Sequence, residues 1–213
     1  MRSWSAVSVA LSVLVSCHPL RTTDTLNERL EHSGYSRLFT LPAARQRLDR
    51  LWAEPGAPER MLDLAADTRA PWRARFLACE VIFHKQMFLI LHRPELFASL
   101  ADVYAKALVE NASGSMADWG FASGMNDPGV VGIRFVVFGL DADHALQPLL
   151  DETGEVAYVY PLDGPFRTRT GLRVKDFAAL HLGELHQIPV RLTEDPAQRD
   201  AEIRRLRSLL RRP

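Results

Sequence analysis

The chain has 213 residues, and its 26 Lys and Arg residues balance its 26 Asp and Glu residues, so the net charge is zero. A hydrophobic share of 47% and a charged share of 24% are typical of a globular domain and exclude a disordered chain. A balanced charge provides no overall attraction for nucleic acid, so we expect no nucleic acid among the partners.

The first residues are typical of an export signal. Arg2 supplies a positive charge, and residues 6–15 form an apolar run too short to span a bilayer, which needs about 20 residues. The run ends in Leu14-Val15-Ser16-Cys17. This motif resembles the lipobox of bacterial lipoproteins, in which an apolar residue and two small or tolerated residues precede the cysteine that is acylated. The alternatives are an ordinary secretory signal with a coincidental cysteine and an uncleaved anchor.

The resemblance implies that residues 1–16 are a signal peptide and that Cys17 becomes the lipidated first residue of the mature chain. Its acyl chains, palmitate among them, would hold the protein to a membrane. His18 in place of an aspartate favours the outer membrane, on the periplasmic side. We therefore expect an exported, lipid-anchored protein, with residues 17–36 as lipidated cysteine and tether and residues 37–213 as one helical domain.

Helical periodicity dominates the first half of this domain. We predict helices over residues 40–53 and 59–66, separated by a segment rich in Pro and Gly. A long apolar helix follows over residues 71–91. Its charged residues exclude a simple membrane span, so we expect it to be the central buried helix. The helix predicted over residues 94–111 has the clearest apolar stripe.

Three residues of the 71–91 helix are of chemical interest. Cys79 lies among apolar residues and is expected to be buried as a small hydrophobe. Glu80 and His84 are four residues apart, so they share a helical face. Such a pair can perform acid–base chemistry, but a polar pair at the rim of the core is the simpler interpretation.

Residues 112–128 are expected to form a long irregular loop, of the kind that carries function or is mobile. Trp119 and Phe121 within it either pack on the helices or contact a ligand or partner. Residues 129–140 are rich in β-branched and aromatic residues that also suit a buried strand. We predict a helix there, because Gly139-Leu140-Asp141 ends it and a second helix follows at once.

The second helix carries Gly139, Ala145-Leu146 and Pro148-Leu149-Leu150, a pattern that resembles the second helix of HEAT-like repeats. No period of forty-odd residues repeats along the chain, which excludes a regular solenoid. The predicted fold is therefore mainly α, with irregular HEAT-like packed helix pairs. One small β-hairpin is predicted near residues 155–170, around Asp163-Gly164.

A helix is expected to follow the hairpin. Lys175 and Asp176 at its start either line a polar groove beside the hairpin, or Asp176 ties down hairpin amides or arginines. His181 and His186 with the neighbouring Glu184 lack the spacing of a zinc helix, so we expect no metal. A last helix begins with Asp195 as its cap, and its arginines are expected on the solvated face.

No phosphate-binding loop, nucleophile elbow, HExxH or CxxC motif is present, so we expect no cofactor and assign no catalytic residue. The predicted function is a non-catalytic interaction or scaffolding module at the cell envelope, held by its lipid and bound to an envelope protein. It would use the 112–128 loop, with Trp119 and Phe121, the hairpin, and the groove between them. The alternatives are an enzyme of unrecognised type and a small-ligand carrier that uses a groove near Lys175 and Asp176.

Overall fold

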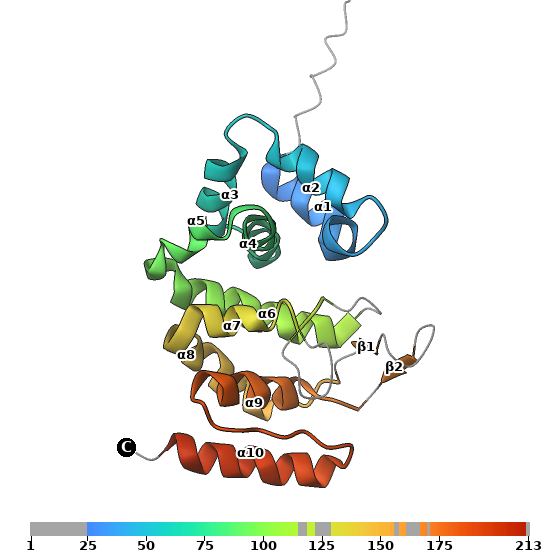
Figure 1. Ribbon diagram of the computed structural model, residues 1–213, viewed down its shortest axis with the longest axis vertical. Helices are drawn as coiled ribbons and strands as arrows, with labels where there is room; N and C mark the ends of the chain where they lie inside the picture. The colour runs from blue at the N-terminus through green and yellow to red at the C-terminus, as the bar shows by residue number, and fades with distance from the viewer. Residues whose placement is uncertain are drawn as a thin grey trace, which may run out of the picture.

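The computed structural model describes residues 25–114, 119–121, 129–155, 158–160, 167–169 and 171–211. In chain order its elements are α1 (Leu26–Phe39), α2 (Ala44–Trp52), α3 (Ala57–Ala66), α4 (Trp72–Gln86), α5 (Phe88–Leu91), η1 (Pro94–Leu96), α6 (Phe97–Gly114), α7 (Ile133–Phe138), η2 (Gly139–Ala142), α8 (Asp143–Leu146), η3 (Gln147–Asp151), β1 (Tyr158–Tyr160), β2 (Arg167–Arg169), α9 (Val174–Leu185) and α10 (Pro196–Leu210). Most described residues are helical, which confirms the mainly α prediction. Figure 1 shows the helices stacked along the longest axis, from α1–α3 at one end to α10 at the other.

The helical domain begins earlier than residue 37. Thr25 caps α1, because its hydroxyl accepts a hydrogen bond from the Glu28 amide while the Glu28 carboxylate accepts one from the Thr25 amide. Leu30 and Leu38 are fully buried, and α1 packs on α2 and α4. The tether expected over residues 17–36 therefore cannot extend past residue 24.

α4 is the central helix of the N-terminal part. All its residues from Ala74 to Phe83 are buried, and it packs on α1, α3 and α6. Cys79 is buried, which confirms that prediction. The single helix expected over residues 71–91 is interrupted at Met87, where α4 ends and α5 begins.

α6 joins the two parts of the molecule, since it contacts α4 as well as α7, α8 and α9. α7 lies within residues 129–140 and η2 begins there at Gly139, so the choice of helix over strand is confirmed for that segment. One continuous cluster of buried apolar side chains extends from Leu30 to Leu206. The described residues therefore share one core.

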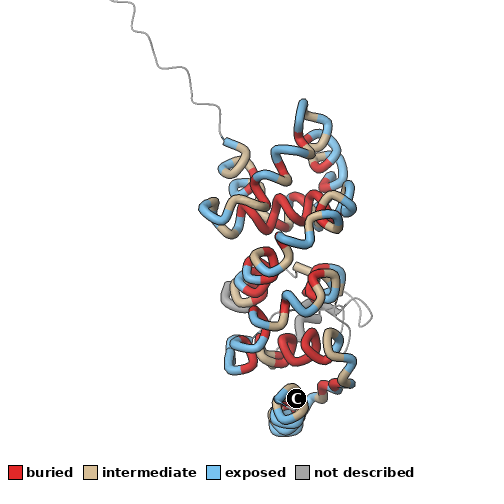
Figure 2. The backbone as a smooth tube through the Cα atoms, turned by 90° about the vertical axis from the view of Figure 1, so that its left-hand side faces the viewer, coloured by how far each residue is buried: buried red, intermediate tan, exposed pale blue. Residues whose placement is uncertain are grey.

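α9 and α10 form the C-terminal end. Gly183 allows the segment after α9 to pass closely, since a Cβ there would lie 2.7 Å from the Ile188 carbonyl oxygen and 2.6 Å from Val190 Cγ2. Asp195 caps α10 by accepting from the Ala197 amide, as predicted. Figure 2 shows α9 largely buried and α10 exposed along its outer side.

β1 and β2 pair in antiparallel register, with Tyr158 opposite Arg169 and Tyr160 opposite Arg167. The expected turn at Asp163-Gly164 lies outside the described residues. The hairpin as a whole therefore stays a prediction.

Candidate functional site at α7

The outer side of α7 is apolar and exposed. Ile133 and Val136, three residues apart on the helix, are 45% and 41% exposed. The hydrogen bonding of a helix already begins before Ile133, so Val130 continues the same side, with 61% exposure. Leu140, two residues past the end of α7, is 68% exposed. We refer to Val130, Ile133, Val136 and Leu140 as the α7 face.

The inner side of α7 packs into the core through aromatic rings. The ring centroids of Phe135 and Phe138 lie 6.2 and 5.2 Å from that of Tyr104 on α6. Phe138 also lies 6.2 Å from Phe83 on α4. α7 is thus apolar on both sides, and a helix that is apolar all round is normally covered. Its exposed side therefore indicates a contact surface.

Arg134 is the one charged residue of α7. Its Nε donates a hydrogen bond to Glu80 Oε1 at 3.2 Å, and its guanidinium carbon lies 4.1 Å from the centre of the Phe83 ring. Both contacts attach α7 to α4. Because the Arg134 side chain is largely buried, its charge is directed into the molecule and not toward the α7 face.

Glu80 is fully buried on α4 and only half of its carboxylate is hydrogen bonded. Oε1 accepts from the Tyr104 hydroxyl and from Arg134, whereas Oε2 has no hydrogen-bond partner among the described residues. His84 Nε2 lies 3.8 Å from Oε2, beyond hydrogen-bond distance. Glu80 and His84 therefore share a helical face, as predicted, without a direct hydrogen bond.

Burial shifts the pKa values of the ionisable groups around Glu80. Burial lowers the pKa of His84, against the opposing effect of the Glu80 charge. Burial also raises the pKa of the Cys79 thiol and that of the Tyr104 hydroxyl, so neither group is an activated nucleophile. The Phe39 ring covers His84 at 4.8 Å between centroids. The cluster holds α7 on α4.

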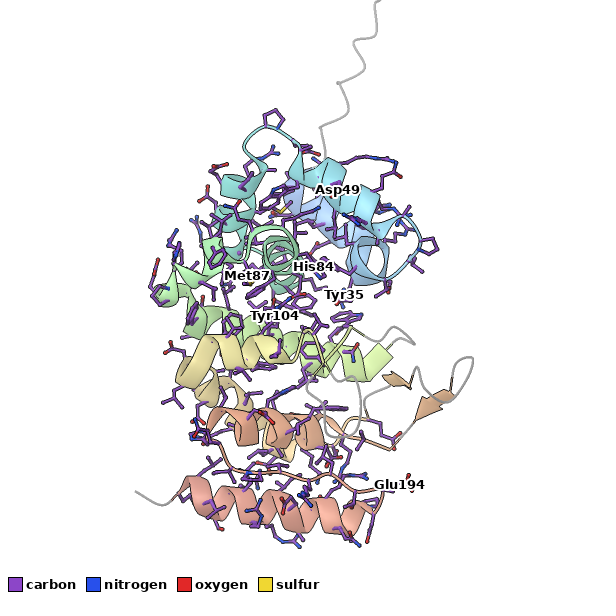
Figure 3. The ribbon with its side chains drawn as sticks, in the orientation of Figure 1. Tyr35, Asp49, His84, Met87, Tyr104 and Glu194 are labelled. Carbon is purple, nitrogen blue, oxygen red and sulfur yellow. The ribbon has the colours of Figure 1, made fainter. Side chains whose placement is uncertain are left out.

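Met87, at the junction of α4 and α5, is a further exposed apolar residue. It follows Phe83 by one helical turn, and Phe83 contacts both Arg134 and Phe138 of α7. Met87 and its neighbour Phe88 are exposed. Figure 3 labels Met87 together with His84 of α4 and Tyr104 of α6.

Trp119 and Phe121, predicted as either packing or binding residues, pack on the helices. The Trp119 ring stacks with those of Tyr35 and Phe76 at centroid distances of 5.8 and 5.5 Å. Phe121 is buried, 6.4 Å from Phe76. Most of the 112–128 loop around these two residues is not described.

The polar groove expected near Lys175 and Asp176 is filled by ion pairs between α9 and α10. Asp176 is fully buried, and its two carboxylate oxygens accept hydrogen bonds from the Arg173 guanidinium at 2.8 and 3.0 Å. Oδ2 also accepts from Arg199 Nε at 3.0 Å. Lys175 Nζ lies 2.9 Å from Asp200 Oδ1, and Lys175 and Arg173 lower the pKa of Asp200 to about 2. Neither predicted residue is open to a ligand.

Arg199 does not lie where we expected it from the sequence. It was expected on the solvated face of the last helix with the other arginines, but it is buried. Besides Asp176, it donates to the backbone carbonyls of Thr193, Glu194 and Gly171. A helical wheel gives the signal in part, because Arg199 lies on the same side of α10 as the buried Ile203 and Leu206.

The histidines of α9 and its end serve different roles. His181 is fully buried 5.1 Å from the Phe135 ring, and neither of its ring nitrogens has a hydrogen-bond partner within the described part of the chain. Burial lowers its pKa to about 3. His186 pairs with Asp143 at 2.6 Å. Within the described ranges no three His, Cys, Asp or Glu side chains are grouped to hold a metal ion.

The chain matches no protein-family model, no curated protein and no solved structure. The resemblances to lipoproteins and to HEAT-like repeats therefore stay predictions. Cys17 lies outside the described residues. Within them, every helix is too short or too polar to cross a bilayer.

Proposed function

We propose that the protein is an exported, lipid-anchored interaction module of the bacterial cell envelope, which binds an envelope protein through the α7 face and catalyses no reaction. The anchor is supported by Leu14-Val15-Ser16-Cys17 alone. The docking role is supported by one observation, the uncharged and exposed α7 face on a helix whose opposite side lies in the core.

Catalysis or ligand transport has less support. Glu80, His84, Lys175 and Asp176, the polar residues that would serve them, do not line the pocket of about 560 Å³ beside α8 and α10. Glu80 and Asp176 are fully buried, and Lys175 is paired with Asp200. The partly exposed His84 has no activated nucleophile beside it. The exposed side chains of the α7 face are apolar and offer a surface for contact.

The anchor is tested by the mass of the mature N-terminal peptide from membrane fractions of cells that make the full chain. We expect diacylated Cys17 at a new N-terminus. A Cys17→Ala variant should be lost from the membrane fraction because no acceptor thiol remains. An unmodified Cys17 contradicts the anchor and leaves the docking role untouched.

The docking role is tested by placing a photo-crosslinking residue at position 133 of the anchored chain, in intact membranes. The matched control carries the same residue at position 201, on the exposed side of α10. We expect a discrete crosslinked protein from position 133 and none, or only diffuse products, from position 201. Equal products from both positions contradict docking at α7.

A further inference from the structure

We infer that the partner of the α7 face is a second copy of this chain, in a symmetric dimer. This inference deepens the proposed function and rests on its docking face, but not on its lipid anchor. In such a dimer each α7 lies against the α7 of the other copy, so the same four side chains are contributed twice.

The absence of charge on the α7 face favours a self-complementary contact. Interfaces with a different protein are on the whole no more apolar than the rest of the surface, whereas interfaces between identical subunits are richer in apolar area. Val130, Ile133, Val136 and Leu140 present no charge, and Arg134 is committed to Glu80. These four side chains meet the same four of a second copy without repulsion and carry no charge pattern that would select another partner, and the exposed carboxylate of Asp141 lies only at the edge of the face.

A lipid bilayer is the other apolar occupant to consider. Helices that lie in a membrane surface combine an apolar face with Lys or Arg side chains for anionic head groups. On α7 the only such residue, Arg134, is turned toward Glu80, and the exposed carboxylate of Asp141 follows Leu140 directly. A carboxylate at the edge of the face is repelled by anionic head groups, so the charge distribution favours a protein surface.

The size of the face predicts a weak and reversible dimer. A stable interface buries about 800 Å² on each partner and involves roughly 20 residues or more. The α7 face offers four exposed side chains. It therefore belongs with the small interfaces of transient complexes, and its occupancy depends on protein concentration.

The test compares variants that differ only in where one glutamate is added. Sedimentation velocity of the purified full chain, on a Cys17→Ala background, is run over about three decades of concentration. For the chain with Cys17→Ala alone, the average mass should rise with concentration toward twice the mass of one chain. Val136→Glu buries a carboxylate at the dimer axis and should raise the dissociation constant about tenfold or more. Ala201→Glu, on the exposed side of α10, should change it by less than about twofold.

A second readout uses the anchored chain in intact membranes. Val136→Cys should form an intermolecular disulfide on mild oxidation, and Ala201→Cys should not. The native Cys79 is fully buried and does not interfere. Circular dichroism of each variant checks that the helices are intact.

A monomer at every concentration, or a dimer unaffected by Val136→Glu, overturns the inference. If the chain is monomeric and position 133 crosslinks to a different envelope protein, the second copy is wrong while the docking function stands. If Cys17 is unmodified but the dimer forms through α7, the anchor is wrong while this inference stands.

Discussion

The α9–α10 junction and the α4–α7 junction each bury a carboxylate completely, but they pair it differently. At the first, both oxygens of Asp176 accept hydrogen bonds, and Arg173 and Arg199 supply its positive charge. At the second, Glu80 uses Oε1 for two donors and leaves Oε2 without a partner in the described part of the chain. A buried polar atom without a hydrogen bond lowers stability by about 1–3 kcal/mol.

The difference teaches that the two ends of the molecule are held in different ways. The closed pairing at Asp176 joins α9 to α10 through Arg199. The open pairing at Glu80 holds α7 by a single carboxylate oxygen and by ring contacts, next to the exposed α7 face. The region that we assign to binding is therefore the one with incomplete polar pairing, as functional regions often are.

The largest expected effect comes from breaking the closed junction. Asp176→Ala removes the carboxylate that pairs with Arg199 and leaves this guanidinium buried. The free energy of unfolding should therefore fall by about 4 kcal/mol. The control Asp200→Ala removes a partly exposed carboxylate from the same network and should lower it by about 1 kcal/mol or less. Urea unfolding measures both. Equal losses would mean that the pairing of Asp176 contributes nothing special.

His181 is a buried polar group whose ring nitrogens have no hydrogen-bond partner among the described residues. In the unfolded chain it binds a proton below about pH 6.5, but in the fold only near pH 3. The unfolded state therefore binds more protons, and stability should decrease by about 2 kcal/mol between pH 6.5 and pH 5. His181→Leu should remove this part of the decrease. His84 shifts in the same direction but is retained in both proteins. Parallel pH profiles of the two proteins contradict the prediction.

The smallest effect should come from the open junction. Glu80→Gln keeps an oxygen that accepts from Tyr104 and Arg134 but removes the charge, so the free energy of unfolding should fall by about 1 kcal/mol. Glu95→Gln, in an exposed pair with Arg93, is the control and should change it by less than about 0.5 kcal/mol. If Glu80→Gln lowered the free energy of unfolding as much as Asp176→Ala, the two junctions would not differ in the way we describe.

The main helices were predictable because their signals are local. The apolar stripe of residues 94–111 led to α6, and Asp195 marked the start of α10. Thr25 and Glu28 form a capping box that is also readable in the sequence, although α1 was expected to be part of the tether.

The candidate site was not predictable because it depends on long-range packing. Residues 129–140 carry no polar side chain except that of Arg134, so periodicity does not tell which side of α7 meets the core. The partner of Arg134 is 54 residues away, and that of Arg199 is 23 residues away. Pairings at such separations are decided by the fold and carry no local pattern.

In the proposed lipoprotein, residues 18–24 are all that separates the acylated Cys17 from Thr25, where α1 is capped. A chain of that length reaches at most about 28 Å. So short a connection would keep every copy in a thin layer along one membrane, where copies meet by diffusion in two dimensions instead of three. An association too weak to persist in dilute solution would then respond to how densely the membrane is populated.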